Sequence, residues 1–287
     1  MAGELTRAAI AAQPEWLARL AVDLRLPDGE ALFTGCGTSF HAAGTGGRAV
    51  QALEFVLAPD RYPADLLILV SHEGGTPLTL EAARAFPGPK WCVTGAPDSP
   101  IASLCEEVVV ATPELDKSYC HTASYTCAVA AIAALRGEDI SWLPDAVAEA
   151  LGDPFPISGH ERWIVVGAGR DQATAEEAVL KLREGTFVAA EAHHTEQLLH
   201  GDLAAVDEAV RAFVLEGEGR AAERAHDAVA ALTELGCDVT LVPTAHPVVD
   251  IVRFQLLTVD LAADRGRNPD LIRRDDERWK RAREAYA

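Results

Sequence analysis

The sequence predicts an α/β protein built from two doubly wound parallel sheets. Short apolar runs that read as strands alternate with helical segments, a pattern typical of parallel sheets covered on both faces. The pattern also occurs twice, because the Gly-x-Gly turns at 35–37 and 167–169 each follow an apolar run. A chain of 287 residues has room for two modest domains of this kind.

The first half begins with an expected amphipathic helix over about 4–24, which Pro14 is expected to break or restart. Apolar runs then predict four strands, and small or periodic residues predict three helices between and after them. The predicted strands are 31–33, 66–70, 90–94 and 107–111, and the predicted helices are 42–50, 78–86 and 122–135.

The second half repeats the arrangement, with strands predicted at 162–166, 212–215 and 237–242. The last stretch is charged and is expected to form a tail or arm. The predicted divisions are an N-terminal helix (1–25), a first domain (26–136), a linker (137–158), a second domain (159–265) and a C-terminal arm (266–287).

Composition narrows the possible functions. Hydrophobic residues make up 49% of the chain and charged residues 24%, which excludes disorder for most of it. The net charge of −19 argues against binding to nucleic acid or to anionic membranes. No signal peptide and no membrane-spanning run is recognisable, so we expect a cytoplasmic protein. The six cysteines form no CxxC pair and are expected to be buried, reduced thiols.

Ligands of open parallel sheets bind beyond the carboxyl ends of the strands. This places the expected site at loops 35–39, 71–76, 112–122 and 167–170, where glycines let backbone N–H groups approach an anion. Neither Gly-x-Gly turn completes the GxGxxG pattern, which argues against a dinucleotide. His193, His194, Glu196 and His200 match no standard zinc spacing, so we predict neither cofactor nor metal.

Several segments resemble proteins of the sugar isomerase (SIS) domain family. They are IAAQP at 10–14, GCGTS at 35–39, SHEGGT at 71–76, DKS at 116–118, TASYT at 122–126, LKLRE at 180–184, AEA at 190–192 and HG at 200–201. Together they are similar to the tandem isomerase half of glutamine–fructose-6-phosphate aminotransferase and to the amino-sugar isomerase/deaminase branch. The resemblance implies two tandem SIS domains of flavodoxin-like fold. No glutaminase activity is expected.

The resemblance also implies roles for individual residues. Glu184 would move a proton between sugar carbons C1 and C2, and His200 would open the ring or protonate a leaving group, reaching across from a partner subunit. Lys181 would assist at the same site. The implied sugar- and anion-binding residues are Cys36, Gly37, Thr38, Ser39, Ser71, His72, Glu73, Thr76, Thr122 and Gly169. Read without the resemblance, Glu184 fits a surface pair with Lys181, and His200 fits a helix end before Gly201.

Two departures from the family pattern affect the expected reaction. The family's C-terminal lysine, which forms a Schiff base with the keto sugar, has no counterpart in RNPDLIRR at 267–274. Glu73 places a carboxylate where the phosphate loop usually offers a hydroxyl. Either Glu73 pairs with an arginine, or the substrate carries no phosphate at this point.

We therefore predict an aldose–ketose isomerase acting on a sugar or sugar derivative through an enediol. The alternatives are a deglycase or deaminase that cleaves the C–N bond of an Amadori-type or amino sugar, and a sugar-sensing protein without turnover. The small-residue segments at 42–50 and 128–135 permit close helix packing. We accordingly expect a homodimer or a dimer of dimers with shared active sites.

Overall fold

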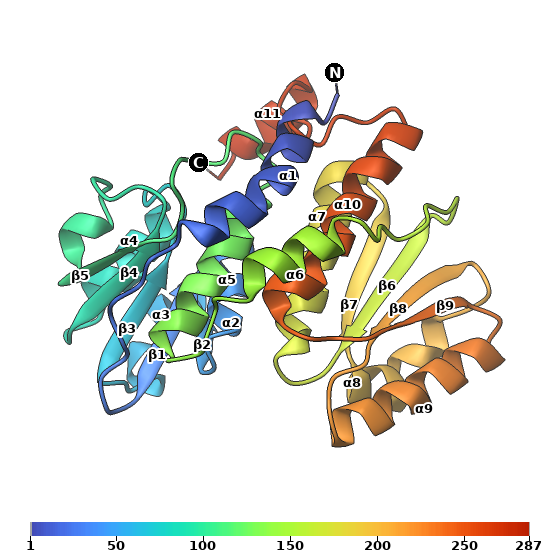
Figure 1. The fold of residues 1–287 in the computed structure, drawn as a ribbon, viewed down its shortest axis with the longest axis horizontal. Coiled ribbons are helices and arrows are strands. Elements are labelled where there is room, and N and C mark those ends of the chain that lie inside the picture. The colour runs from blue at the N-terminus through green and yellow to red at the C-terminus, as the bar shows by residue number, and fades with distance from the viewer. Residues whose placement is uncertain (1, 287) are drawn as a thin grey trace.

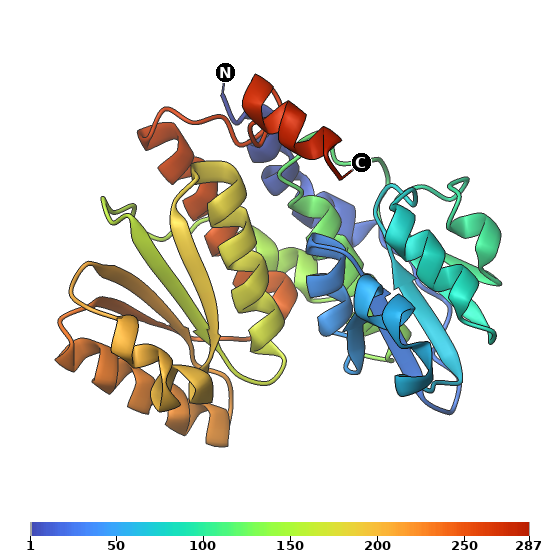
Figure 2. The ribbon, with the colours of Figure 1, turned by 180° about the vertical axis from the view of Figure 1, so that it is seen from behind.

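The computed structural model describes residues 2–286 and arranges them in five layers (Figure 1). Two parallel sheets stand on either side of a central layer of helices, and each sheet carries further helices on its outer face (Figure 2). The N-terminus and the C-terminus lie at the same end of the molecule. No helix of residues 2–286 is long and apolar enough to cross a membrane.

The first sheet has the strand order β2-β1-β3-β4-β5, and its registered neighbours are all parallel. Its strands are β1 (Ala31–Gly35), β2 (Ala49–Gln51), β3 (Leu66–Val70), β4 (Lys90–Thr94) and β5 (Glu107–Val110). The helices of this half are α2 (Thr38–Gly44), α3 (Ala52–Leu57), α4 (Pro77–Ala85) and α5 (Ala123–Leu135). The strands predicted at 31–33, 66–70, 90–94 and 107–111 are confirmed.

The second sheet has the order β7-β6-β8-β9, also parallel throughout. Its strands are β6 (Arg162–Gly167), β7 (Ala189–His194), β8 (Val210–Leu215) and β9 (Asp238–Val242). The helices of this half are α7 (Asp171–Thr186), α8 (Thr195–His200), α9 (Arg220–Glu234) and α10 (Pro247–Asp264). The order matches β2-β1-β3-β4 of the first sheet, strand for strand.

Alternation along the strands divides the apolar side chains among three cores. Ile68 and Val70 of β3 face the central helices, while Leu67 and Leu69 face α3 and α4 on the outside. In the second sheet the inner residues of β6 join the same central core, and Ile164 faces α8 and α9. Both sheets are therefore buried on both faces, which explains why their strands read as continuous apolar runs.

Helix α1 (Glu4–Ala18) packs in the central layer against α5, α10 and α6 (Leu143–Ala150). Pro14 lies inside this helix and does not break it, contrary to the sequence prediction. A proline has no N–H for the carbonyl four residues earlier. The Gln13 side-chain amide donates to that carbonyl, of Ile10, at 3.0 Å. The helix ends at Ala18, before the predicted limit at residue 24.

One other predicted helix needs correction. The helix predicted at 42–50 ends at Gly44, and 49–51 forms the edge strand β2. Gly47 has φ +110°, and a Cβ on Gly46 would lie 2.7 Å from the Phe33 ring, so the chain turns there at close range. The predicted linker 137–158 contains α6, whose Leu143 and Val147 are fully buried in the central core.

The C-terminal arm forms an ordered structure that ends in α11 (Glu277–Glu284). Asp270 anchors the arm to the first turn of α1, because its carboxylate accepts from the Thr6 amide at 2.8 Å and the Thr6 hydroxyl at 2.7 Å. The Asp270 carbonyl accepts from the Tyr119 amide at 3.1 Å. The arm is thereby fixed to α1 and to the loop before α5.

Candidate active site

A cavity of about 550 Å³ opens beyond the carboxyl ends of β1, β3 and β4. Its wall is completed by α5, by Glu184 of α7 and by the C-terminal arm, so both halves of the chain contribute to it. Its lining includes most of the predicted binding residues, namely Cys36, Thr38, Ser39, Ser71, His72, Glu73, Thr76 and Glu184. Of the four loops predicted from the rule for open parallel sheets, 35–39, 71–76 and 112–122 contribute to this cavity, whereas 167–170 does not.

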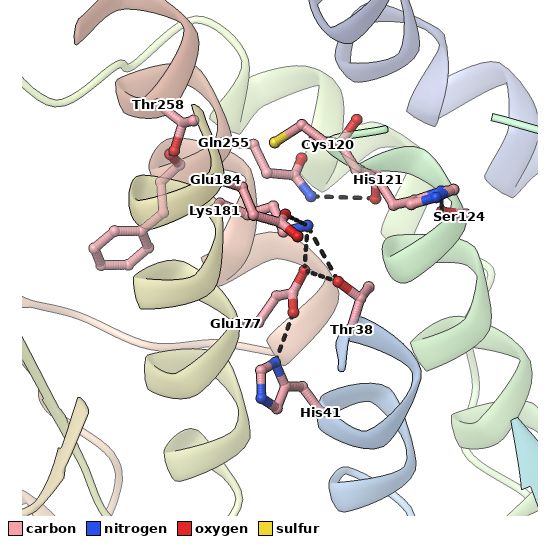
Figure 3. A network of polar contacts seen from close by, with 12 residues as sticks. Thr38, His41, Cys120, His121, Ser124, Glu177, Lys181, Glu184, Gln255 and Thr258 are labelled. Carbon is pink, nitrogen blue, oxygen red and sulfur yellow. Dashed lines mark hydrogen bonds and ion pairs between the residues drawn. The ribbon is translucent and has the colours of Figure 1, made fainter. Parts of the chain in front are cut away.

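Lys181 and Glu184 lie one helical turn apart on α7, at the boundary with α2 (Figure 3). The Lys181 ammonium donates to Glu184 Oε2 at 2.7 Å and to Thr38 Oγ1 at 3.1 Å. The Lys181 side chain is 0% exposed, whereas that of Glu184 is 23% exposed. The pair predicted as a possible surface contact is thus a buried cation presenting a partly exposed carboxylate to the cavity.

Glu177 completes this network, and the sequence prediction missed it. Its carboxylate is 0% exposed and lies 3.3 Å from the Lys181 ammonium, one turn earlier on α7. His41 of α2 contacts the other carboxylate oxygen through Nδ1 at 2.8 Å. Burial alone would lower the pKa of Lys181, but the Glu177 and Glu184 carboxylates outweigh burial and raise it. Lys181 therefore stays charged.

Close helix packing fixes the position of Glu184. The next residue is Gly185, where a Cβ would lie 2.4 Å from Thr258 Cγ2 of α10. Only a glycine allows α10 to approach α7 this closely, so Gly185 determines how near the last turn of α7 lies to α10. The signal was present in the sequence as a glycine inside a helical pattern.

Hydroxyl groups from two adjacent loops line the wall beside this pair. Thr38 and Ser39 begin α2, and the Ser71 and Thr76 hydroxyls lie 3.5 Å apart after β3. Glu73 lies in the same loop, is exposed and lines the cavity. Within residues 2–286, no arginine or lysine forms an ion pair with Glu73, so the arginine partner that we considered from the sequence is not present there.

A buried aspartate organises the loop before α5. Asp116 Oδ2 accepts from the Thr122 amide at 3.0 Å, and the Asp116 amide donates to His72 Nε2 at 2.9 Å. His72 Nε2 is therefore an acceptor, as in a neutral imidazole. Burial, followed by the nearby His121, lowers the pKa of His72 to about 4, although Asp116 opposes the change. Burial also lowers the pKa of His121, whose ring meets that of His72 edge-on at 5.3 Å.

Five predicted site residues do not line this cavity within the described chain. Lys181 lies behind Glu184, Gly37 lies between the lining residues Cys36 and Thr38, and the other three lie farther away. His200 ends α8, is 75% exposed and pairs with Glu196 at 3.0 Å. Gly169 follows β6 and lines a separate crevice of about 220 Å³ on the second sheet. Thr122 is buried behind the lining, where its carbonyl accepts from Gln255 at 3.2 Å. Residues 2–286 contain no group of three or more side chains arranged to hold a metal ion.

The arrangement has the components for moving protons on a polyhydroxylated ligand. Glu184 offers a partly exposed carboxylate to the cavity, and the buried Lys181 ammonium supports that carboxylate from behind. The surrounding hydroxyls and neutral imidazoles match the hydrogen-bonding groups of a sugar. A carboxylate within reach of a carbon acid is a suitable general base at neutral pH.

One segment of the chain matches a known protein family. Residues 157–268 match the family model of the SIS domain. A SIS domain is therefore present in this segment, which contains the second sheet together with Lys181 and Glu184.

The chain is similar in sequence to two curated enzymes called glutamine–fructose-6-phosphate aminotransferase (isomerizing). It is 27% identical to that of Methanothermobacter thermautotrophicus over 290 residues, covering 83% of this chain and 49% of the relative. It is 28% identical to that of Thermus thermophilus over 258 residues, covering 71% and 42% respectively. The chain thus spans about half the length of these relatives, or less.

Solved structures share the whole fold at lower identity. Glucosamine-6-phosphate deaminase from Thermotoga maritima superimposes with a TM-score of 0.78 at 20% identity, covering 93% of this chain and 97% of that one. Tagatose-6-phosphate ketose/aldose isomerase from Escherichia coli gives 0.77 at 18% identity, covering 94% and 95%. The fold is the one found in phosphosugar isomerases and deaminases.

Proposed function

We propose that this protein is an enzyme of the aldose–ketose isomerase type, which moves a proton between C1 and C2 of an open-chain sugar or sugar derivative. The observation that carries the proposal is the Glu184 carboxylate, which lines the cavity and is held by the buried Lys181 ammonium at 2.7 Å. Glu184 acts as the base. The hydroxyls of Thr38, Ser39 and Ser71 hold the sugar oxygens.

The proposal also gives each of the two sheets a role. The SIS match covers the second sheet, and the first sheet repeats its strand order. We take the first half as a second SIS domain, so that the chain is a tandem pair. The sugar lies on the first domain, and the second domain supplies Lys181 and Glu184 from α7.

His200 enters the site from a second copy of the chain. This part of the proposal rests on the exposure of His200 and on its absence from the cavity lining. In a two-fold dimer, each site would combine Glu184 of one copy with His200 of the other. His200 then opens the sugar ring or protonates a leaving group.

Mixing two inactive variants tests the shared site. Glu184→Gln and His200→Asn are unfolded together, refolded and assayed against each variant refolded alone. If the site is shared, half of the dimers are mixed and one of their two sites is intact, so about a quarter of the wild-type activity returns. If both residues act within one chain, the mixture stays inactive.

Cleavage of a C–N bond by the same enediol chemistry is the second candidate function. It is favoured by Glu73, a cavity carboxylate without a cationic partner in residues 2–286, which suits an amine-bearing ligand. The absence of lysine from 267–274 also leaves no side chain there for a Schiff base.

One experiment separates the candidates. The protein is incubated in heavy water with a panel of sugars, phosphosugars and amino-sugar derivatives, and the products are followed by NMR. Solvent deuterium at C1 or C2 with a changed carbonyl position identifies an isomerase, and release of free amine identifies C–N cleavage. Binding without exchange for every member of the panel contradicts both and indicates a sensor.

A further inference from the structure

The charged groups around the cavity are unevenly distributed. Glu73 and Glu184 contribute carboxylates, while His72 and His121 are neutral near pH 7 because burial lowers their pKa. Among the described residues that line the cavity, Arg274 is the one whose side chain is cationic at neutral pH. Lys181 stands behind Glu184, with its donors already used by Thr38 and two carboxylates.

Arg274 reaches the cavity from the C-terminal arm. Its guanidinium carbon stands 4.0 Å from the centroid of the Tyr119 ring, and Tyr119 also lines the cavity. Stacking on an aromatic face leaves the N–H edge of a guanidinium free to donate. No carboxylate of residues 2–286 forms an ion pair with Arg274. Its donors are therefore available to a ligand.

The backbone next to Arg274 is held in an unusual conformation. Ile272 has φ +41° and Arg273 has φ +60°, a left-handed geometry that is strained for a non-glycine residue. The Arg283 guanidinium donates to the Ile272 carbonyl at 2.7 Å, and Arg273 stacks on the Phe187 and Trp279 rings at 4.0 Å each. These contacts hold the strained turn that directs Ile272 and Arg274 to the cavity.

We propose that Arg274 is the residue that binds an anionic substituent, a phosphate or a carboxylate, on the sugar substrate. The anion then lies at the mouth formed by the C-terminal arm, and the loop at 71–76, which carries Glu73, faces uncharged hydroxyl or amine groups. This inference rests on the proposed function for the ligand class, since it takes the ligand of the cavity to be a sugar derivative.

Binding of three acyclic probes tests the assignment. D-Glucitol, D-glucitol 6-phosphate and D-gluconate lack the carbonyl that enediol chemistry needs, so calorimetry measures binding without turnover. The wild type is compared with Arg274→Gln, Arg274→Lys and Arg278→Gln. The last variant is the matched control, because Arg278 is an exposed arginine of the same arm outside the cavity lining.

Arg274→Gln is expected to weaken binding of at least one anionic probe about 10- to 100-fold, the usual effect of losing a charge-assisted hydrogen bond. Binding of glucitol should change less than about twofold. Arg274→Lys should restore part of the loss, and Arg278→Gln should resemble the wild type. Whichever of the two anionic probes responds identifies the group as a phosphate or a carboxylate.

Three results would overturn the assignment. They are an equal loss for all three probes, no loss for either anionic probe, and no binding of either anionic probe to the wild type at millimolar concentration. Because binding is measured without turnover, failure of the deuterium-exchange experiment leaves this result interpretable.

Discussion

The two sheets share a strand order but end in very different crevices. The crevice of the first sheet encloses about 550 Å³ and is faced by hydroxyls and by Glu184. That of the second encloses about 220 Å³, and its polar groups bond to one another. Gly217 donates to the Thr244 hydroxyl at 3.1 Å, and the Ala245 amide donates to Asp250 at 2.9 Å.

This difference shows that repeating a fold does not repeat its site. In the first crevice, hydroxyls of the first half lie beside Lys181 and Glu184, which α7 of the other half supplies. The described residues that line the second crevice all come from the second half, and the Gly217 and Ala245 amides donate to groups of that same half. One half therefore presents the ligand-facing surface, and the other contributes α7 to it.

The largest expected effect is on the chemical step. Glu184→Gln keeps the shape of the side chain and removes the base, so turnover should fall about 10²- to 10⁴-fold while ligand binding is retained. Glu218→Gln, the same change in the crevice of the second sheet, is the control and should leave kcat unaltered. Near-wild-type activity of Glu184→Gln would remove this residue from the mechanism.

The next largest effect concerns the buried cation. Lys181→Met leaves the Glu177 carboxylate buried without its ammonium partner, which should lower the free energy of unfolding by about 3–5 kcal/mol. Lys280→Met removes an exposed ion pair with Glu277, which solvent screens, and should leave the free energy of unfolding nearly unchanged. Urea denaturation of both variants measures the difference, and equal losses would contradict the role given to Lys181.

The two crevices should respond oppositely to pH. Burial lowers the pKa of His72 to about 4, so its contribution to stability is lost as pH falls from about 6.5 towards 4. Burial raises the pKa of Asp250 to about 7, so the native state binds the extra proton and loses stability as pH rises from about 4 to 7.

Replacing each group isolates its contribution. Asp250→Asn should stabilise the protein at pH 8 by about 4 kcal/mol, which corresponds to a pKa raised from 3.8 to about 7, with little change at pH 4. His72→Asn should flatten the acid side of the stability profile instead. Thermal unfolding measured between pH 4 and 8 gives both slopes, and a stabilising effect of Asp250→Asn confined to acid pH would contradict the assignment.

The smallest expected effect comes from alanine substitutions at two equivalent glycines. Gly37 and Gly169 follow the first strand of each sheet, with φ of +55° and +59° and no atom within 4 Å of an added Cβ. Alanine at either position should cost about 1–3 kcal/mol of stability because φ is positive at both positions. Only Gly37→Ala should also weaken sugar binding several-fold, since Cys36 and Thr38 beside it line the cavity. Equal effects on binding would restore Gly169 to the site.

Hydrophobic periodicity and the positions of strand ends predict much of the fold from the sequence. The buried strands of both sheets and the position of the cavity followed from apolar runs and from the carboxyl-end rule. The edge strand at 49–51 could not be predicted, because three residues after a glycine turn carry no period. Helix α6 could not be distinguished from a linker, since tertiary packing rather than propensity fixes it.

Less of the candidate site than of the fold could be predicted from the sequence. Glu184 and Lys181 were predictable from a resemblance, but Glu177 and His41 acquire their role only when α2 and α7 meet. Arg274 lies 90 residues from Glu184 along the chain, in a charged stretch that reads as a tail. Contacts between distant segments leave no local pattern, so the charge balance of the site could not be predicted.

Residues 137–158 separate the segment that encodes the cavity hydroxyls from the segment that encodes the proposed base. A molecule in which only one sheet has formed therefore has no working site, however native its helices and strands are. During refolding, circular dichroism follows the formation of helices and strands, whereas recovery of activity counts the molecules in which α7 has docked onto α2. The interval between the two signals measures how long the two halves take to dock after their helices and strands have formed.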